Sequence, residues 1–312
     1  MKKRVLAALA VLFAMMISAW CFAEEETAEI LSSGEWEYYI NDDGMATISS
    51  CNTDDEKLVI PEEIDGLQVT EIGEDAFHGC SSLTSVEIPE SVTEIGEDAF
   101  SICSSLTSIE IPESVIEIGE DAFFGCRSLV SISVSPENKN YAAIDNVLFE
   151  KSSKTLICYP YGSTENEYAI PEGITAIGEN AFHDCSSLAS IEIPESVTEI
   201  GECAFTLCSS LTSIEIPESV TAIKDFTFSN CSSLTSIEIP ESVASIGEYA
   251  FSNCRSLKSI EIPESVTEIG ENAFHDCSTL TLIVERDSYA AQYAKENDIP
   301  YTFPDANDWL ND

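Results

Sequence analysis

The sequence predicts a repeat solenoid, a row of stacked coils with a parallel β-sheet running along it. A block of 23 residues recurs almost unchanged, as at 81–103, 209–231 and 232–254. A unit this short cannot enclose a core of its own, so its apolar side chains must be buried against the next copy. In addition, 44% of the residues are hydrophobic, and their regular recurrence favours a packed fold over disorder.

Residues 1–23 are predicted to be a secretory signal peptide. Three basic residues open the chain, an apolar run from Val5 to Ala19 follows, and small side chains stand near position 23. A lipoprotein modified at Cys21 is the alternative, although bulky Trp20 stands where that signal needs a small residue. The run is short for a bilayer, so we expect a secreted or cell-surface protein with no transmembrane segment in the mature chain.

The net charge of the chain limits the class of partner. It is −44 at neutral pH, and removal of the leader with its three basic residues leaves about −47. Phosphate binding needs a basic stripe, which the few remaining Lys and Arg cannot form against 57 acidic residues. The composition therefore excludes nucleic acid as a partner.

Residues 24–50 are expected to cap the open N-terminal end. The segment from Trp36 to Ile48 contains Asp42-Asp43-Gly44 at its middle, which is typical of a β-hairpin. The solenoid itself is expected to span residues 51–285.

Each copy is expected to contain a strand, a second extended stretch and a turn. In the copy at 81–103, the apolar residues of 83–88 indicate a strand with one outward residue between two inward ones, and Pro89 ends it. Residues 92–95 form the second extended stretch. We expect Gly96 to supply the backbone freedom for a helical turn at 97–100 on the convex side.

A Phe in each copy is expected to form a buried aromatic spine, as opposed to a groove for an aromatic ligand. Thr227 and Lys224 replace the usual Ala and Gly in one copy, which is therefore the irregular one. The spine residues are Phe77, Phe100, Phe123, Phe182, Phe205, Phe228, Phe251 and Phe274.

An ordered insert of about 135–170 is expected to divide the solenoid into two blocks, because the cysteine spacing rises there to 59 residues. Its apolar runs at 147–149 and 156–160 flank a polar turn and indicate a hairpin feeding an extra coil. At the other end, residues 286–312 are expected to form a C-terminal cap, with a short helix at 288–295 and a last strand at 299–303.

The repeat resembles a known family. Its pattern, Leu-x-x-Ile-x-Ile-Pro-x-x-Val-x-x-Ile-Gly-x-x-Ala-Phe-x-x-Cys, is similar to the BspA-like leucine-rich repeats, also called the Treponema pallidum type, of bacterial and protist surface proteins. The resemblance covers nearly all of the mature chain. It implies a leucine-rich-repeat-like solenoid with the parallel sheet on its concave face, and it implies adhesin-like binding of host matrix or plasma proteins.

The outward strand position predicts a ladder of carboxylates down this sheet. Neighbouring strands lie roughly 4.8 Å apart, so two such charges repel by about 0.8 kcal/mol in bulk water. Raised pKa values, bound cations or a basic partner would offset the repulsion. The alternative is that the glutamates only keep the sheet soluble and unpaired with other sheets. The ladder consists of Glu87, Glu110, Glu192, Glu215, Glu238 and Glu261.

The candidate binding residues lie mainly in the second block. Ser133 interrupts the ladder before the insert, so Glu192 to Glu261 is its longest unbroken run. A column of small hydroxyls flanks these four carboxylates and leaves them open, namely Ser190, Ser213, Ser236 and Ser259.

Cysteine and histidine are interpreted as structural. Eight cysteines share one register and point the same way, which is poor geometry for disulfides or zinc and favours buried free thiols. A disulfide or reactive thiol is expected first among the three outside the register, Cys51, Cys158 and Cys203. His78, His183 and His275 occupy a tolerant surface position. The eight in register are Cys80, Cys103, Cys126, Cys185, Cys208, Cys231, Cys254 and Cys277.

The sequence therefore predicts a noncatalytic binding scaffold of about eleven coils, spanning roughly 50 Å at one strand spacing per coil. No motif of an enzyme, a metal site or a phosphate loop occurs in it. We expect no cofactor beyond weak surface binding of Ca²⁺, and a protein or glycoprotein ligand with a basic patch. The alternative function is a structural component of the cell envelope or matrix, cross-bridged by divalent cations.

Overall fold

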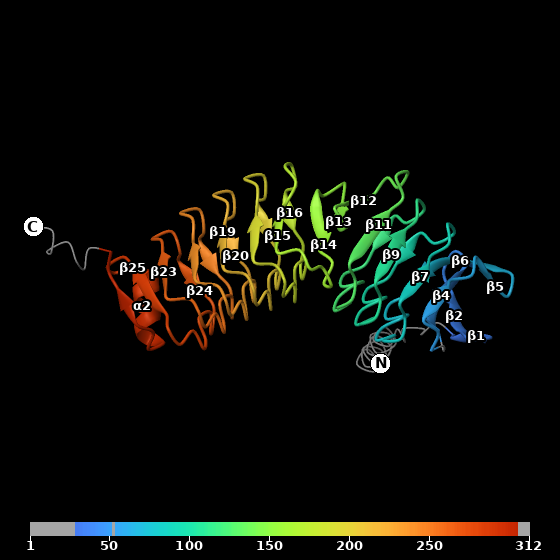
Figure 1. Ribbon diagram of the computed structural model, residues 1–312, viewed down its shortest axis with the longest axis horizontal. Coiled ribbons are helices and arrows are strands. Elements are labelled where there is room, and N and C mark those ends of the chain that lie inside the picture. The colour runs from blue at the N-terminus through green and yellow to red at the C-terminus, as the bar shows by residue number, and fades with distance from the viewer. Residues whose placement is uncertain (1–28, 52–53, 305–312) are drawn as a thin grey trace, which may run out of the picture.

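A computed structural model describes residues 29–51 and 54–304, and these form a single curved row of coils (Figure 1). The predicted signal peptide and the last residues of the predicted C-terminal cap lie outside the described residues. The stacked coils confirm the predicted solenoid.

None of the described helices is long and apolar enough to cross a membrane.

One side of the coils carries the strands that include the glutamate ladder, and we call it the glutamate face. Its strands run parallel and in register, so that Ser131 lies beside Ser108 and Glu215 beside Glu238. They are β4 (Lys57–Val59), β7 (Ser85–Glu87), β9 (Ser108–Ile111), β11 (Ser131–Val134), β15 (Glu167–Ala169), β17 (Ser190–Glu192), β19 (Ser213–Glu215), β21 (Ser236–Glu238), β23 (Ser259–Ile262), β25 (Thr281–Val284) and β26 (Tyr301–Thr302).

A second side carries shorter parallel strands, and we call it the short-strand face. Two-residue pairings such as Ile177 with Ile200 hold it together. Its strands are β6 (Leu67–Ile72), β8 (Glu94–Ile95), β10 (Glu117–Ile118), β14 (Thr155–Cys158), β16 (Ala176–Ile177), β18 (Glu199–Ile200), β20 (Ala222–Ile223), β22 (Ser245–Ile246) and β24 (Glu268–Ile269).

The third side of each coil is a turn, and the prediction of a helical turn at 97–100 is wrong. Asp98 has φ +52, which no right-handed helix contains. The N–H groups of Asp98 and Phe100 donate to Glu120 and Ala122 of the next coil, at 3.0 and 2.8 Å. The turn therefore satisfies its main chain partly within its own segment, as in the bond from the Ser101 N–H to the Asp98 carbonyl, and partly along the stack.

Gly96 is required for space, not for the backbone freedom predicted from the sequence. Its φ is not positive, and a Cβ there would lie 2.7 Å from the main-chain nitrogen of Glu74 in the preceding coil. The left-handed conformation falls instead on Asp98, a residue type that tolerates it.

The aromatic spine is confirmed. The ring centroids of Phe77 and Phe100 are 5.1 Å apart with 7° between the planes, and those of Phe251 and Phe274 are 5.5 Å apart. Trp36 closes the N-terminal end edge-on to Phe77. Tyr293 does the same at Phe274. Both ends of the apolar core are therefore covered.

The two caps agree with the predictions. At the N-terminus, β1 (Leu31–Ser33), β2 (Trp36–Ile40) and β3 (Ala46–Cys51) form an antiparallel meander, and β3 joins the short-strand face through β6. A short β5 (Glu63–Ile64) pairs antiparallel with β6. At the other end, α2 (Tyr289–Glu296) begins after Ser288, whose hydroxyl accepts a hydrogen bond from the Ala291 N–H.

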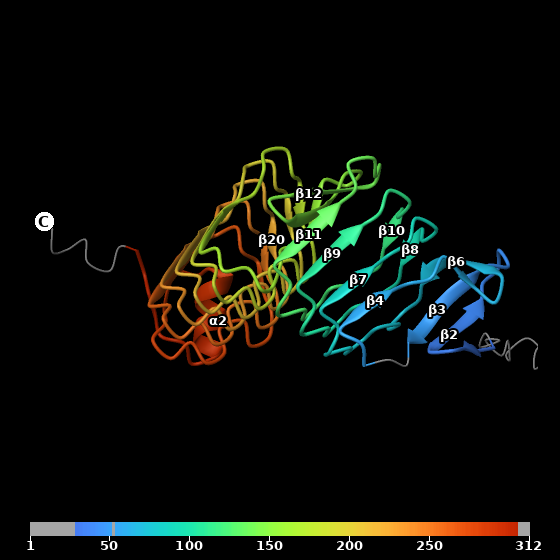
Figure 2. The ribbon, with the colours of Figure 1, turned by 45° about the vertical axis from the view of Figure 1, so that its right-hand side comes forward.

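The insert forms the predicted hairpin and divides the core. Strand β12 (Tyr141–Ile144) pairs antiparallel with β13 (Val147–Glu150), which pairs antiparallel with β14. Leu148 and Cys158 pack into the core of the first block, whereas Phe149 and Tyr159 pack into that of the second. The row of coils changes direction at this point (Figure 2).

Truncation of a spine residue tests the stacked core. We expect Phe205→Ala to lower the free energy of unfolding by about 3–5 kcal/mol, because its fully buried ring leaves a cavity. Denaturant unfolding followed by circular dichroism measures the loss. Phe226→Ala is the matched control, since that ring is 38% exposed, and it should cost less than about 1 kcal/mol. A loss below about 1 kcal/mol at Phe205 would contradict the spine.

Candidate binding surfaces

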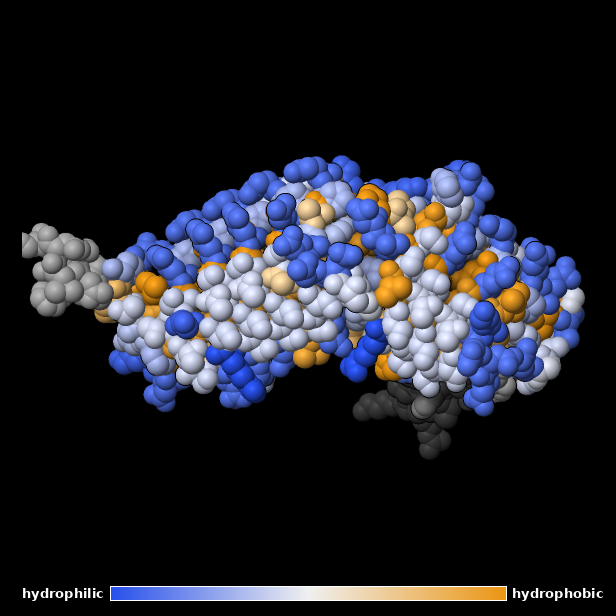
Figure 3. Space-filling model, viewed as in Figure 1, coloured by the Kyte–Doolittle hydropathy of each residue, from blue (hydrophilic) through white to orange (hydrophobic). Residues whose placement is uncertain are grey.

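The six predicted glutamates all lie exposed on the glutamate face. Ser133 stands beside Glu110 and Ala169 beside Glu192, so the ladder is interrupted on both sides of the insert. The run from Glu192 to Glu261 is unbroken, as the sequence indicated. Figure 3 shows hydrophilic residues along the upper edge of the coils, with apolar patches over the first block and beside the insert.

The predicted serines line the same face. Ser190 is half-buried, and Ser213, Ser236 and Ser259 are exposed. Each lies two residues before a ladder glutamate, and alternate residues of a strand share a side. Every carboxylate of the run therefore has a small hydroxyl beside it, and the pair is backed by a buried isoleucine.

A large hollow on the glutamate face lies over the first block, which sequence reasoning did not favour. It has a volume of about 840 Å³ and runs across β4, β7 and β9. Val59 takes the ladder position beside Glu87 and is 63% exposed, and Lys57 takes the serine position beside Ser85. This part of the face is therefore more apolar and less acidic than the second block.

A second column of carboxylates lies on the short-strand face and was missed. Glu71, Glu94 and Glu117 occupy paired positions of β6, β8 and β10. Burial raises the pKa of Glu94, and the charges of Glu71 and Glu117 raise it further. Asn41 and Thr47 each donate a hydrogen bond to Glu71 at 2.7 Å. The 23-residue spacing of these glutamates was the signal that could have found them.

The in-register cysteines are free thiols inside the stack, as predicted. The thiol of Cys103 donates to the carbonyl of Phe77, the spine residue of the preceding coil, at 3.1 Å. Five further column thiols make the same contact with the spine residue of the coil before them. Burial raises the pKa of Cys126 and of Cys231 to about 12. Cys126 and Cys231 are therefore protonated and poor nucleophiles. Cys277 at the C-terminal end differs, because a hydrogen bond from Cys254 lowers its pKa.

The cysteines outside the register are also free. Burial raises the pKa of Cys51 and of Cys158 to about 12, and it also raises the pKa of Cys203. Cys158 raises the pKa of both Cys126 and Cys185, so it lies near both of them. A reactive thiolate is therefore not favoured at these positions either.

The interpretation of the histidines as one tolerant surface position is wrong for His183. Its ring centroid lies 4.7 Å from that of Phe124, and its Nδ1 atom is buried without a hydrogen-bond partner. Burial lowers its pKa. His78 and His275 instead lie about half exposed beside aspartates. Within the described ranges, no group of three or more His, Cys, Asp or Glu is placed to hold a metal ion.

Thiol titration tests the cysteine column. We expect a thiol reagent to modify few cysteines in the folded protein and many more after unfolding without reductant, because burial keeps the thiols protonated and out of reach. If unfolding exposes no additional thiols, the column is oxidised and the prediction is wrong.

The Glu94 carboxylate predicts a pH dependence of stability. Because its pKa is higher in the folded than in the unfolded state, its contribution to the free energy of unfolding falls as the pH rises from the ordinary carboxylate range through the raised pKa. Glu94→Gln should therefore raise the melting temperature at neutral pH. It should also reduce the increase in melting temperature that mild acidification produces. Glu172→Gln, at an exposed turn, is the control. A lower melting temperature for Glu94→Gln at neutral pH would contradict this.

Comparison with known proteins agrees with this architecture. The family model of the BspA type leucine rich repeat region matches residues 51–165 and 158–281, with 6 copies. A search of curated proteins found no match.

Solved structures share the fold. A leucine rich cell surface protein of Faecalibacterium prausnitzii is 28% identical over 88% of this chain and 98% of its own, with a TM-score of 0.55. A leucine-rich repeat protein of Bacteroides ovatus is 30% identical over 81% of this chain and 70% of its own, with a TM-score of 0.57. The pneumococcal vaccine antigen PcpA, 17% identical over 88% and 98% with a TM-score of 0.57, shares the fold alone.

The family model covers most of the chain, and its repeat coincides with the coils, the spine and the cysteine column described above. The chain belongs to the BspA-type leucine-rich repeat family.

Proposed function

We propose that the protein is a noncatalytic, secreted or surface-associated scaffold that binds a protein or glycoprotein through the glutamate face of its second block. The observation that carries the proposal is the unbroken run of Glu192, Glu215, Glu238 and Glu261 on a rigid sheet. The family and the similarity to a cell surface protein support a scaffold for protein interaction at the cell surface.

The stack makes this surface suitable for multivalent contact. The isoleucine between each serine and glutamate is buried, which fixes the strand beneath the carboxylates. A partner with a basic patch would neutralise several carboxylates at once without rearranging them. Repulsion between neighbouring strands would then decrease on binding, and this decrease adds to the affinity.

Removing the four charges tests the proposal. The test is a quadruple variant, Glu192→Gln, Glu215→Gln, Glu238→Gln and Glu261→Gln. We expect it to bind immobilised extracellular-matrix proteins more weakly, by roughly tenfold or more, and its affinity to lose most of its salt dependence. Surface plasmon resonance at low and high salt measures both. The fold should be retained or stabilised, because Gln preserves size and hydrogen bonding.

A second quadruple variant is the matched control. Glu94, Glu117, Glu199 and Glu268 lie on the short-strand face, so their change to Gln removes the same charge from another side of each coil. Unchanged affinity of the glutamate-face variant, or equal loss in both variants, would reject the proposed surface. Self-association that depends on Ca²⁺ and is abolished by a chelator would favour the cross-bridged structural role instead.

A further inference from the structure

In the extra coil formed by the insert, the segment between the short strand and the spine residue is two residues shorter than in the neighbouring coils. In the preceding coil four residues, 119–122, separate the short strand from the spine residue Phe123. In the insert coil only Ile157 and Cys158 stand between Leu156, which pairs with Ile177, and Tyr159, which takes the spine position. This coil therefore lacks the equivalents of Glu120 and Asp121, which in the preceding coil follow the short strand.

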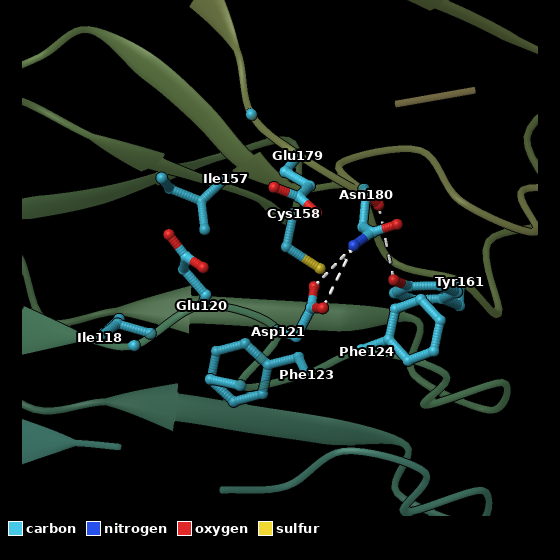
Figure 4. A pocket seen from close by; sticks show the side chains of 13 residues that line it. Ile118, Glu120, Asp121, Phe123, Phe124, Ile157, Cys158, Tyr161, Glu179 and Asn180 are labelled. Carbon is cyan, nitrogen blue, oxygen red and sulfur yellow. Dashed lines mark hydrogen bonds between the residues drawn. The ribbon is translucent and has the colours of Figure 1, made fainter. Parts of the chain in front are cut away.

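This deletion leaves a crevice between the coils before and after the insert (Figure 4). Its volume is about 180 Å³. The side-chain nitrogen of Asn180 crosses it and donates to both carboxylate oxygens of Asp121, at 3.0 and 3.2 Å. Residues 59 apart in sequence thus contact each other directly because the intervening coil does not reach between them.

The ladder of main-chain hydrogen bonds also stops at the crevice. In the coil before, the N–H groups of Asp98 and Phe100 donate to the next turn. The corresponding N–H groups of Asp121 and Phe123, both of which line the crevice, make no main-chain hydrogen bond within the described part of the chain. Two hydrogen-bond donors are therefore available there to an external acceptor.

The crevice combines an apolar interior with an acidic rim. Ile118, Phe123 and Tyr161 line it on the inside. Carboxylates of Glu120, Asp121 and Glu179 stand around it. Burial raises the pKa of Asp121, although the hydrogen bond from Asn180 opposes this shift. Burial also raises the pKa of Glu179, and the charges of Asp121 and Glu120 raise it further. The rim therefore carries negative charge that is incompletely compensated by the protein.

We propose that this crevice binds one basic side chain, lysine or arginine, of an extended polypeptide partner. An apolar cavity of about 150 Å³ accommodates benzene, so this volume suits a single side chain. The methylene stem would pack against the apolar interior while the charged end meets the rim carboxylates. A carbonyl group of the same peptide would accept a hydrogen bond from the free N–H groups. This site is distinct from the glutamate face, and its test does not depend on that face.

A titration with short peptides tests the site. The probes are capped tripeptides with a central lysine, norleucine or glutamate, added to isotope-labelled protein and followed by NMR. We expect the lysine peptide to shift the amide signals of Gly119, Ile157 and Gly178, and the other two to shift them little. The double variant Glu120→Gln with Glu179→Gln should weaken binding of the lysine peptide by roughly tenfold or more.

The repeat offers a matched control. Glu74 and Glu248 occupy the same repeat position in coils that do not adjoin the crevice, and both are exposed. The variant Glu74→Gln with Glu248→Gln therefore removes equal charge and should change affinity less than about twofold. Thermal unfolding checks the fold of each variant. If the crevice double variant unfolds, the single variant of exposed Glu120 replaces it.

Three results would overturn the proposal. The first is equal binding of the norleucine peptide, which would make the crevice an apolar site. The second is that the control variant weakens binding of the lysine peptide equally, which would mean that the overall negative charge, not the crevice, causes the binding. The third is that free spermidine shifts the same signals more strongly than the lysine peptide, which would assign the site to small amines instead of polypeptides.

Discussion

The burial of one coil against the next is the interaction on which the rest of this structure depends. A single coil contributes one Phe ring and one thiol, and neither is covered until the neighbouring coil supplies another ring and a carbonyl acceptor, as Phe100 and Cys103 show with Phe77. The main chain follows the same rule, since the turn at Asp98 is hydrogen-bonded to the next coil. Stability is therefore a property of interfaces between coils, and each end requires a cap such as Trp36.

This rule has an electrostatic consequence. Coils that repeat in register place identical side chains in columns, so each outward glutamate faces another glutamate one strand away, as Glu215 faces Glu238. Repulsion accumulates along the stack, and it is strongest where burial reduces solvation, as at Glu94. Only a few basic residues relieve it, such as Lys224, which contacts Glu199 at 2.6 Å. The large buried core stabilises the fold enough to tolerate this charged surface.

The sequence predicts the features that repeat. It does not predict the features that depend on how closely one coil approaches the next. The period and the apolar positions are sufficient for the coil, the Phe spine and the caps. The same pattern could not show that Gly96 is required for space, because that follows from its approach to Glu74 of the preceding coil. Likewise His183 resembles His78 in its repeat position, yet it packs on Phe124 because the intervening coil is short.

The insert matters because it interrupts contacts that the regular coils make with one another. In the regular coils the turn donors and the spine ring are covered by the next coil, as Asp98 and Phe100 show. Loss of two residues between Leu156 and Tyr159 breaks that coverage locally, while the pairing of β14 with β16 and the stacking of Tyr159 on Phe182 join the insert to the coils that follow. The uncovered groups of the adjoining coils, Asp121 and Phe123 among them, line the resulting crevice. A solenoid can acquire a specific pocket in this way without altering the repeats on either side.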